Sequence, residues 1–352
     1  MMDIEKIVAY AIENQVSDIH ITEGNHDSFR SHGQLIRQPN LVIGRARIAA
    51  ILKPDQLKLA AQGVDLDFAA GYGGGRQRIN VFQAGGQLAV AIRLLNDTIP
   101  SLDALRMPPV LKQLAAEPRG LVLVTGPTGS GKSTTLASMI DYVSQTRDCH
   151  IITIEDPVEY LYQENRALIH QREVGRDVES FATALRSALR EDPDVILVGE
   201  MRDYETIAAA VTAAETGHLV LSTLHTTGAA KTVDRIIDVF PPHAQAQIRA
   251  QLAGVLKGVI SQQLLPLQPD RAGQIQGRIA AMEIMLGTDA VLNLIREGKA
   301  HQLNTVIQSG AALGMQTLDC CLANYVRQEL ITWEMAQQYA DNPGELRRLA
   351  AI

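Results

Sequence analysis

Glycines, a lysine and several hydroxyl-bearing side chains stand together in one short stretch of the chain. The stretch reads Gly126-Pro127-Thr128-Gly129-Ser130-Gly131-Lys132-Ser133-Thr134 and follows the spacing G-x-x-x-x-G-K-[ST]. Glycines let the backbone curl so that its N–H groups point at phosphate oxygens, and a following helix adds the positive end of its dipole. We therefore expect the stretch to bind a nucleoside triphosphate, with Lys132 reaching the β- and γ-phosphates and Ser133 holding Mg²⁺.

The segments on either side of this loop supply the context that the motif requires. The apolar run 121–124 before it predicts a buried parallel strand, and residues 135–140 after it predict a helix. A chance glycine-rich turn is the alternative interpretation. A strand–loop–helix context favours a phosphate-binding loop over such a turn.

Acidic residues follow two other apolar runs, and ligands in parallel sheets bind at the carboxyl ends of strands. The run 194–198 is followed by Gly199, where a metal-binding aspartate usually stands, and then by Glu200. Glu200 is therefore the predicted contact to Mg²⁺ through water, or to the attacking water; the alternative is a glutamate that caps the next turn. Asp194 lies at the opposite end of the strand, too far away to reach the metal.

The second acidic cluster follows the apolar run 151–154 and contains Glu155, Asp156 and Glu159. Carboxylates gathered at one edge repel each other unless a cation or polar partner offsets their charge. We expect Glu159 to orient or deprotonate the water that attacks the γ-phosphate, and a solvated acidic turn is the alternative.

A histidine stands at each end of the predicted strand 219–223. His225 follows the carboxyl end, so we expect it near the γ-phosphate. His218 precedes the strand, where a lone histidine is equally consistent with a structural role.

Transfer of a phosphoryl group usually needs an arginine, which a neighbouring subunit supplies in some enzymes. No basic residue besides Lys132 is obvious within the core of the predicted site. The candidates stand on N-terminal strands and around the acidic run: Arg78, Arg93, Arg186, Arg190 and Arg202. Surface ion pairs are the alternative for each of them taken singly.

The elements that must position these residues form two α/β domains. Residues 1–97 predict a small domain with a helix over 3–14, a turn-rich stretch over 25–33, a helix over 45–61, and an antiparallel sheet. Its expected strands span 17–22, 65–69, 76–82 and 88–93. Residues 98–119, within a proline-rich stretch, are the predicted linker.

Apolar runs at 121–125, 150–154, 194–198 and 219–223 alternate with helical segments, so a parallel sheet covered on both faces is expected. This predicted nucleotide-binding core spans 120–285, with one long helix over 243–265 and a strand over 279–285. A helical region over 286–352 completes the chain, with its helices at 288–297, 302–308, 315–328 and 332–340.

The composition restricts the partners. A net charge of −7 over 352 residues, without a Lys- or Arg-rich run, argues against nucleic acid as a ligand. Three cysteines without a C-x-x-C pair indicate a reducing compartment and no zinc module. No signal peptide or apolar run of membrane-spanning length is present in the sequence, which predicts a cytoplasmic protein.

Taken together, these motifs resemble the PilT-type retraction ATPases of type IV pili, within the secretion ATPase superfamily. The resemblance extends over almost the whole chain. The segments that carry it are 126–135, 155–159, 171–174, 184–194, 199–203, 212–218, 224–227, 259–262 and 314–319.

The resemblance implies a homohexameric motor that hydrolyses ATP with Mg²⁺ to power pilus retraction and twitching motility. It implies a PAS-like N-terminal domain, a RecA-like ATPase domain, and ATP bound between them. By motif position, Glu200 is the atypical Walker B acid, Glu159 the catalytic glutamate and His225 the histidine nearest phosphate. Arg78 and Arg93 match the N-terminal arginines of the family, and an adjacent subunit supplies the arginines that complete each site.

The implied partners are the inner-membrane platform protein, the pilus machinery and a paralogous ATPase, with the motor bound peripherally to the inner membrane. Two segments, 25–33 and 252–260, depart from the family pattern. A pilus-assembly or type II/IV secretion motor of the same superfamily is the first alternative. A nucleic-acid translocase and a small-molecule kinase are alternatives from other classes.

Overall fold

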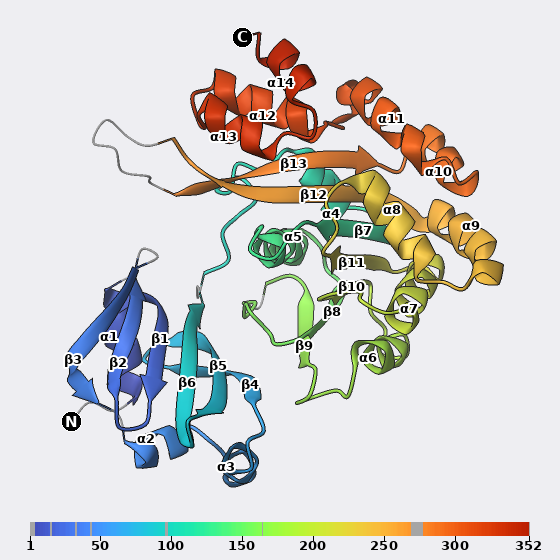
Figure 1. Cartoon of the computed structure of the whole chain (residues 1–352). Coiled ribbons are helices and arrows are strands. Elements are labelled where there is room, and N and C mark those ends of the chain that lie inside the picture. The colour runs from blue at the N-terminus through green and yellow to red at the C-terminus, as the bar shows by residue number, and fades with distance from the viewer. Residues whose placement is uncertain are drawn as a thin grey trace. The chain divides into compact units, whose positions relative to one another are not determined.

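The computed structural model describes residues 4–14, 16–31, 34–42, 44–95, 98–163, 165–268 and 277–351. The chain divides into two compact units (Figure 1). The N-terminal unit comprises Met1–Ile99 together with Pro157–Leu161, and the C-terminal unit comprises Pro100–Asp156 and Tyr162–Ile352. Among the described residues, no helix combines the length and apolar character needed to cross a membrane. Residues 96 and 97, at the predicted domain boundary, lie outside the described part.

The N-terminal unit is built on an antiparallel sheet of six strands in the order β3-β2-β1-β6-β5-β4. Its strands are β1 (Val16–Thr22), β2 (His26–Ser31), β3 (Gln34–Val42), β4 (Leu66–Tyr72), β5 (Gly75–Ala84) and β6 (Gln87–Leu95). Its helices are α1 (Ile4–Glu13), α2 (Arg45–Ala49) and α3 (Pro54–Ala61). The predictions for the helix over 3–14 and for β1, β4, β5 and β6 are confirmed.

One face of this sheet forms the core of the unit. Ile19 and Ile79 alternate with polar residues along their strands, and Ile92 pairs with both of them across the sheet. The three side chains share one face and are fully buried. The apolar positions of α1, including Ile7 and Val8, join the same cluster. The opposite face of the central strands carries charged side chains.

Two predictions for this unit are wrong. The stretch 25–33 is not a turn, because His26–Ser31 forms β2 and pairs with β1; residues 32 and 33 lie outside the described part. The expected helix over 45–61 consists of α2 and α3 instead. Pro54 is the first residue of α3, where a missing N–H costs no hydrogen bond, whereas inside one continuous helix it would break the ladder.

The C-terminal unit contains a sheet of seven strands in the order β13-β12-β7-β11-β10-β8-β9. All neighbours pair in parallel except β12 and β13, which form an antiparallel pair along the edge (Figure 1). The strands are β7 (Gly120–Thr125), β8 (His150–Glu155), β9 (Leu168–Glu173), β10 (Val195–Val198), β11 (Leu219–Leu224), β12 (Leu256–Pro266) and β13 (Arg278–Leu286). The four predicted parallel strands and the strand over 279–285 are confirmed, whereas β9 was not predicted.

Helices cover both faces of this sheet, as the alternation in the sequence predicts. Along β7, Leu121 and Leu123 pack into one core cluster, and Val122 and Val124 pack into the other. The first cluster contains side chains of α6 (Phe181–Ala188), α7 (Tyr204–Glu215), α8 (Ala229–Asp238) and α9 (Gln245–Val255). The second contains side chains of α4 (Val110–Ala115) and α5 (Lys132–Thr146).

The prediction of one helix over 243–265 is wrong in its second half. A short 3-10 turn, η1 (Pro242–Ala244), leads into α9, which ends at Val255; the chain then continues as β12, parallel to β7 and antiparallel to β13. Gly258 and the β-branched Val259 and Ile260 favour a strand over a helix. Leu256–Pro266 therefore adds a strand to the sheet beside the phosphate loop.

Short helices follow β13. They are α10 (Asp289–Arg296), η2 (Ala300–Gln302), α11 (Leu303–Ser309), η3 (Ala311–Leu313), α12 (Leu318–Arg327), α13 (Trp333–Tyr339) and α14 (Pro343–Ala350). The four predicted C-terminal helices are confirmed, and α14 was not predicted.

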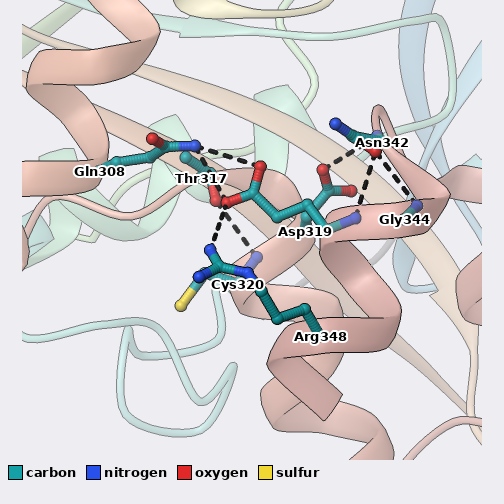
Figure 2. A network of polar contacts seen from close by, with 8 residues as sticks. Gln308, Thr317, Asp319, Cys320, Asn342, Gly344 and Arg348 are labelled. Carbon is teal, nitrogen blue, oxygen red and sulfur yellow. Dashed lines mark hydrogen bonds and ion pairs between the residues drawn. The ribbon is translucent and has the colours of Figure 1, made fainter. Parts of the chain in front are cut away.

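Buried polar contacts attach α14 to α12. The carboxylate of Asp319, which is buried on α12, accepts hydrogen bonds from the backbone N–H groups of Asp341 and Asn342, at 2.9 Å each. Figure 2 shows Asp319 next to Asn342. The side chain of Asn342 in turn accepts from the N–H groups of Gly344 and Glu345 in the first turn of α14. Asp319 therefore fixes the start of the last helix on the sheet unit.

Candidate functional site

The phosphate loop connects β7 to α5 at the carboxyl end of the parallel sheet. Gly126, Gly129 and Gly131 have φ angles of 139°, 80° and 87°, which side chains other than glycine rarely adopt. Gly131 is the residue immediately before α5, so the loop ends at the positive end of the helix dipole. The glycines thus give the loop the curvature that a phosphate cradle requires.

Lys132 is held inside this loop. Its ammonium group donates hydrogen bonds to the carbonyl oxygens of Gly126 at 2.9 Å and Pro127 at 3.0 Å, and the residue is 8% exposed. The hydroxyl of Ser130 is buried without a hydrogen-bond partner among the described residues. A cation and an orphaned hydroxyl around left-handed glycines fit a phosphate group, and the exposed Ser133 leaves a hydroxyl available for Mg²⁺.

Two of the predicted residues meet at the ends of adjacent strands. Glu200 follows β10 and His225 follows β11, and these strands pair in parallel. The Nε2 atom of His225 lies 3.5 Å from a carboxylate oxygen of Glu200, and the other oxygen accepts from Nε of Arg202 at 2.7 Å. The Glu200 side chain is 19% exposed, so its charge is partly shielded from water. The attraction between His225 and Glu200 is strongest when the imidazole is protonated.

The acidic residues at the carboxyl end of β8 and beyond it lie in different units. One carboxylate oxygen of Glu155 accepts from the hydroxyl of Thr153 at 2.7 Å and from the amide of Gln171 at 3.3 Å, so polar partners stabilise this charge. Glu159 belongs to the segment Pro157–Leu161 of the N-terminal unit, where it is half-buried. The structure therefore brings together Glu200 and His225 but describes Glu159 with the other unit.

Arg78 and Arg93 stand opposite each other on β5 and β6. Like charges in such a cross-strand pair repel, and an aspartate beside each arginine offsets the repulsion. Arg78 forms a two-pronged pair with Asp67, at 2.6 Å for the closest atoms, and Nε of Arg93 lies 3.0 Å from Asp18. Burial raises the pKa of Asp18, but hydrogen bonds, chiefly from Arg93, outweigh this effect and lower its pKa below the usual value.

The residues expected at the opposite end of the sheet are found there. The side chain of Asp194, just before β10, accepts from the backbone N–H of His150 at the start of β8. Nδ1 of His218, just before β11, lies 2.9 Å from the carbonyl oxygen of Ala213. The Asp194 contact joins the amino ends of β10 and β8, whereas the His218 contact joins the amino end of β11 to helix α7. Both side chains lie at the end of the sheet opposite to the phosphate loop.

Sequence reasoning assigned no role to Gln262, which the structure places against the phosphate loop. The residue is 1% exposed, and its side-chain amide forms hydrogen bonds with Ser130 and Thr135. The signal in the sequence is a polar residue at the end of a β-branched run, which becomes informative once β12 is recognised as a strand.

The loop between β7 and α5, with an acid beyond β10 and a histidine beyond β11, defines a P-loop nucleotide-binding protein on a mostly parallel sheet. Residues 1–326 match the family described as Type II/IV secretion system protein. The chain belongs to this family, and within it to the group of the pilus retraction ATPase PilT.

Two relatives and one solved structure are similar to this chain over nearly its whole length. The Type IV pilus retractation ATPase PilT of Pseudomonas aeruginosa is 47% identical over 347 residues, covering 97% of this chain and 99% of the relative. The Twitching motility protein of Neisseria gonorrhoeae is 47% identical over 349 residues, covering 95% and 92%. A crystal structure of the pilus retraction motor PilT with bound ADP is 44% identical, covers 99% of this chain and 100% of that chain, and superposes with a TM-score of 0.91.

Proposed function

We propose that this chain is the ATP-hydrolysing motor that retracts type IV pili. The observation that carries the proposal is the 47% identity to a retraction ATPase, which covers 97% of this chain and 99% of that relative. The geometry of the phosphate loop and of the Glu200–His225 pair is consistent with the hydrolysis of ATP. Water is the phosphoryl acceptor, and the products are ADP and phosphate.

The first step is binding of the triphosphate. Lys132 leaves its carbonyl partners for the β- and γ-phosphates, where its charge compensates theirs, and the loop N–H groups bind phosphate oxygens. Ser133 and, through water, Glu200 would hold Mg²⁺. The metal ion would neutralise charge on the phosphates. No large movement of the backbone is needed, because the loop already has its left-handed glycine conformations.

The second step is activation of water and stabilisation of the transferring phosphoryl group. Glu200 and Glu159 are the candidate acids that orient the water and accept its proton. His225 lies beside Glu200, and its hydrogen bonds change when the γ-phosphate is lost. Arg78 and Arg93 release Asp67 and Asp18 and contribute their charge to the site of a neighbouring subunit.

Because the arginines act in the site of a neighbouring subunit, the proposed mechanism requires an oligomer. We propose a homohexamer in which each subunit supplies the phosphate loop of one site and the arginines of another. The ring would act at the cytoplasmic face of the inner membrane on the platform protein of the pilus machine, with a paralogous ATPase as a further partner. Nucleic acid is not among the proposed ligands, since the chain carries a net charge of −7.

Deletion of the gene in the host tests the proposal. Cells without the retraction motor should carry excess pili and lose twitching, and the wild-type gene should restore both phenotypes. A gene encoding Glu200→Gln should restore neither, and one encoding Glu205→Gln, an exposed glutamate outside the site, should restore both. Cells without pili would instead indicate an assembly motor and contradict the proposed direction.

A further inference from the structure

The side chain of Gln262 connects β12 to the phosphate loop. Ser261 is the last residue of β12 that pairs with β7, opposite Thr125, so Gln262 stands beside the point where the loop begins. Its Nε2 donates to the carbonyl oxygen of Ser130 at 2.5 Å, and its Oε1 accepts from the hydroxyl of Thr135 at 2.8 Å. One buried amide thereby holds both ends of the segment that contains Lys132.

The two partners fix the orientation of this amide. The carbonyl oxygen of Ser130 can only accept a hydrogen bond, so it must face the NH₂ group, which leaves Oε1 toward Thr135. Ser130 precedes Gly131 in the loop, and Thr135 lies in the first turn of α5. A shift of the loop relative to the helix would therefore break at least one of the two hydrogen bonds.

Two glycines of the loop also adjoin Gln262. A Cβ atom added at Gly126 would lie 2.1 Å from the carbonyl oxygen of Gln262, and one added at Gly131 would lie 2.9 Å from its Nε2. These positions are thus glycines for a second reason besides their φ angles. Close backbone contact leaves the loop little freedom to relax around a changed side chain at position 262.

The same pair of strands supports the segment that follows His225. The hydroxyl of Ser261 accepts from the N–H of Gly228 at 2.7 Å, and the carboxylate of Glu283 accepts from the N–H of Ala229 at 2.6 Å. Ser261 and Glu283 stand directly opposite each other on β12 and β13. The edge hairpin therefore contacts both the phosphate loop and the start of α8.

We infer that Gln262 is a positioning residue of the nucleotide site, which holds the phosphate loop in its binding conformation by bridging Ser130 and Thr135. It acts through the N–H groups of the loop, Lys132 and Ser133, and does not itself contact the phosphates. The inference rests on the proposed function in one respect, that the loop binds ADP and ATP. We assign Gln262 no role in the hydrolysis step itself.

Replacement of Gln262 by methionine tests the inference, because methionine keeps the length of the side chain and removes both hydrogen bonds. Isothermal titration with ADP and Mg²⁺ should give ~10- to 100-fold weaker binding, as expected when a buried donor and acceptor lose their partners. The KM for ATP should rise by a similar factor with kcat changed less than about threefold, because a displaced loop binds the ground state and the transition state less tightly by the same amount. The control is Gln263→Met, one position along the strand and on its opposite face.

Gln262→Glu supplies a second readout that general loss of folding cannot reproduce. A protonated glutamic acid can donate to Ser130 and accept from Thr135 as the amide does, whereas its carboxylate would repel the carbonyl oxygen of Ser130. Binding of ADP with Mg²⁺ by this variant, relative to wild type, should therefore weaken about tenfold or more between pH 6 and pH 8.

The outcomes separate the two proposals. Wild-type protein that binds ADP, together with both Gln262 variants within twofold of it at every pH, would overturn the role of Gln262 and leave the proposed function standing. Wild-type protein that binds neither ADP nor ATP would overturn both. A loss confined to the Gln262 variants, with the pH dependence in Gln262→Glu, supports the inference.

Discussion

Polar groups are handled differently in the two units of this protein. In the C-terminal unit, Lys132 and Gln262 are buried, and their polar atoms form hydrogen bonds mainly with backbone carbonyls of the phosphate loop. In the N-terminal unit, Arg78 and Arg93 lie on an accessible sheet face with side chains 40% and 67% exposed, paired with aspartates. Buried hydrogen bonds to backbone resist exchange, whereas exposed ion pairs contribute about 0–1 kcal/mol and exchange easily.

This difference fits the two proposed roles, which are binding of the nucleotide by the C-terminal unit and supply of arginines to a neighbouring subunit by the N-terminal unit. A phosphate cradle must hold its shape before the nucleotide arrives, and buried hydrogen bonds provide that shape. Arginines that act in the site of a neighbouring subunit must exchange one ion-pair partner for another. Weak ion pairs at the surface allow this exchange at little cost in free energy. Asp27 departs from the pattern of exposed, paired charges in the N-terminal unit. This residue is fully buried, and neither of its carboxylate oxygens has a hydrogen-bond partner among the described residues.

Removal of the cation from the preformed cradle should have the largest effect. Lys132→Ala leaves the carbonyls of Gly126 and Pro127 without their donor and removes the charge that faces the phosphates. Phosphate release should fall by roughly 1,000-fold or more, measured with a coupled assay at saturating ATP. The control is Lys299→Ala, an exposed lysine paired with Glu297. Activity of Lys132→Ala within tenfold of wild type would show that the loop does not carry the chemistry.

The buried carboxyl of Asp27 should make the N-terminal unit sensitive to pH. Burial raises the pKa of Asp27 to about 7, above the value of 3.8 that applies in the unfolded chain. Between these values the native state retains a proton that the unfolded state has lost, so the free energy of unfolding falls as pH rises from about 4 to 7. The loss amounts to roughly 4 kcal/mol for a shift of about three units.

Asp27→Asn should remove this pH dependence. Hydrogen exchange of the amides of β1 and β2, corrected for intrinsic rates, should show protection that decreases from pH 5 to pH 8 in wild type and changes less in the variant. Asp55→Asn, at an exposed position, should behave as wild type. Parallel pH profiles for wild type and Asp27→Asn would contradict the shifted pKa.

Glu200→Gln tests the cluster at the carboxyl end of β10. The change preserves shape but removes the charge, so turnover should decrease about 100- to 1,000-fold while ADP binding stays within a few-fold of wild type. Loss of the pair with Arg202, whose side chain is 71% exposed, should cost little stability. Glu205→Gln is the matched control, since Glu205 pairs with Arg186 on the surface. Normal turnover in Glu200→Gln would transfer the role of the acid to Glu159.

The arginine pair should show small effects on stability and a distinctive effect in mixtures. Arg78→Gln and Arg93→Gln should each change the free energy of unfolding by less than about 1 kcal/mol and lower turnover by about 100-fold, as loss of one transition-state donor does. Subunits with Arg78→Gln mixed with subunits with Lys132→Ala should recover activity, because a site can then combine the intact Lys132 of one with the intact Arg78 of the other. Mixtures as inactive as the separate variants would contradict a role in a neighbouring site.

Much of the candidate site could be predicted because it follows from local rules. The parallel strands appear in the sequence as uninterrupted apolar runs, and the rule that ligands bind at carboxyl ends brings Glu200 and His225 to one edge. The structure agrees, with 3.5 Å between the two side chains. Separation of Asp194 from this edge followed from the same rule.

The remainder depended on pairing between distant segments. The run that contains β2 is polar and rich in turn-forming residues, and only its pairing with β1 makes it a strand. Residues 256–265 continue the apolar pattern of α9, so periodicity alone did not reveal where the helix ends. Because β12 was read as helix, Gln262 could not be placed against the phosphate loop.

The pairing of β12 with β7 also has a consequence for synthesis of the chain. The hydrogen bond from Gln262 to Ser130 joins residues 132 positions apart. At ~5–20 residues per second, a ribosome needs roughly 7 to 26 s to make the residues between them. If Gln262 holds the phosphate loop as we infer, a nascent chain possesses the complete loop sequence well before it can bind nucleotide tightly. Competence to bind ATP would then appear only when the edge hairpin has emerged and joined the sheet, after most of the protein has been made.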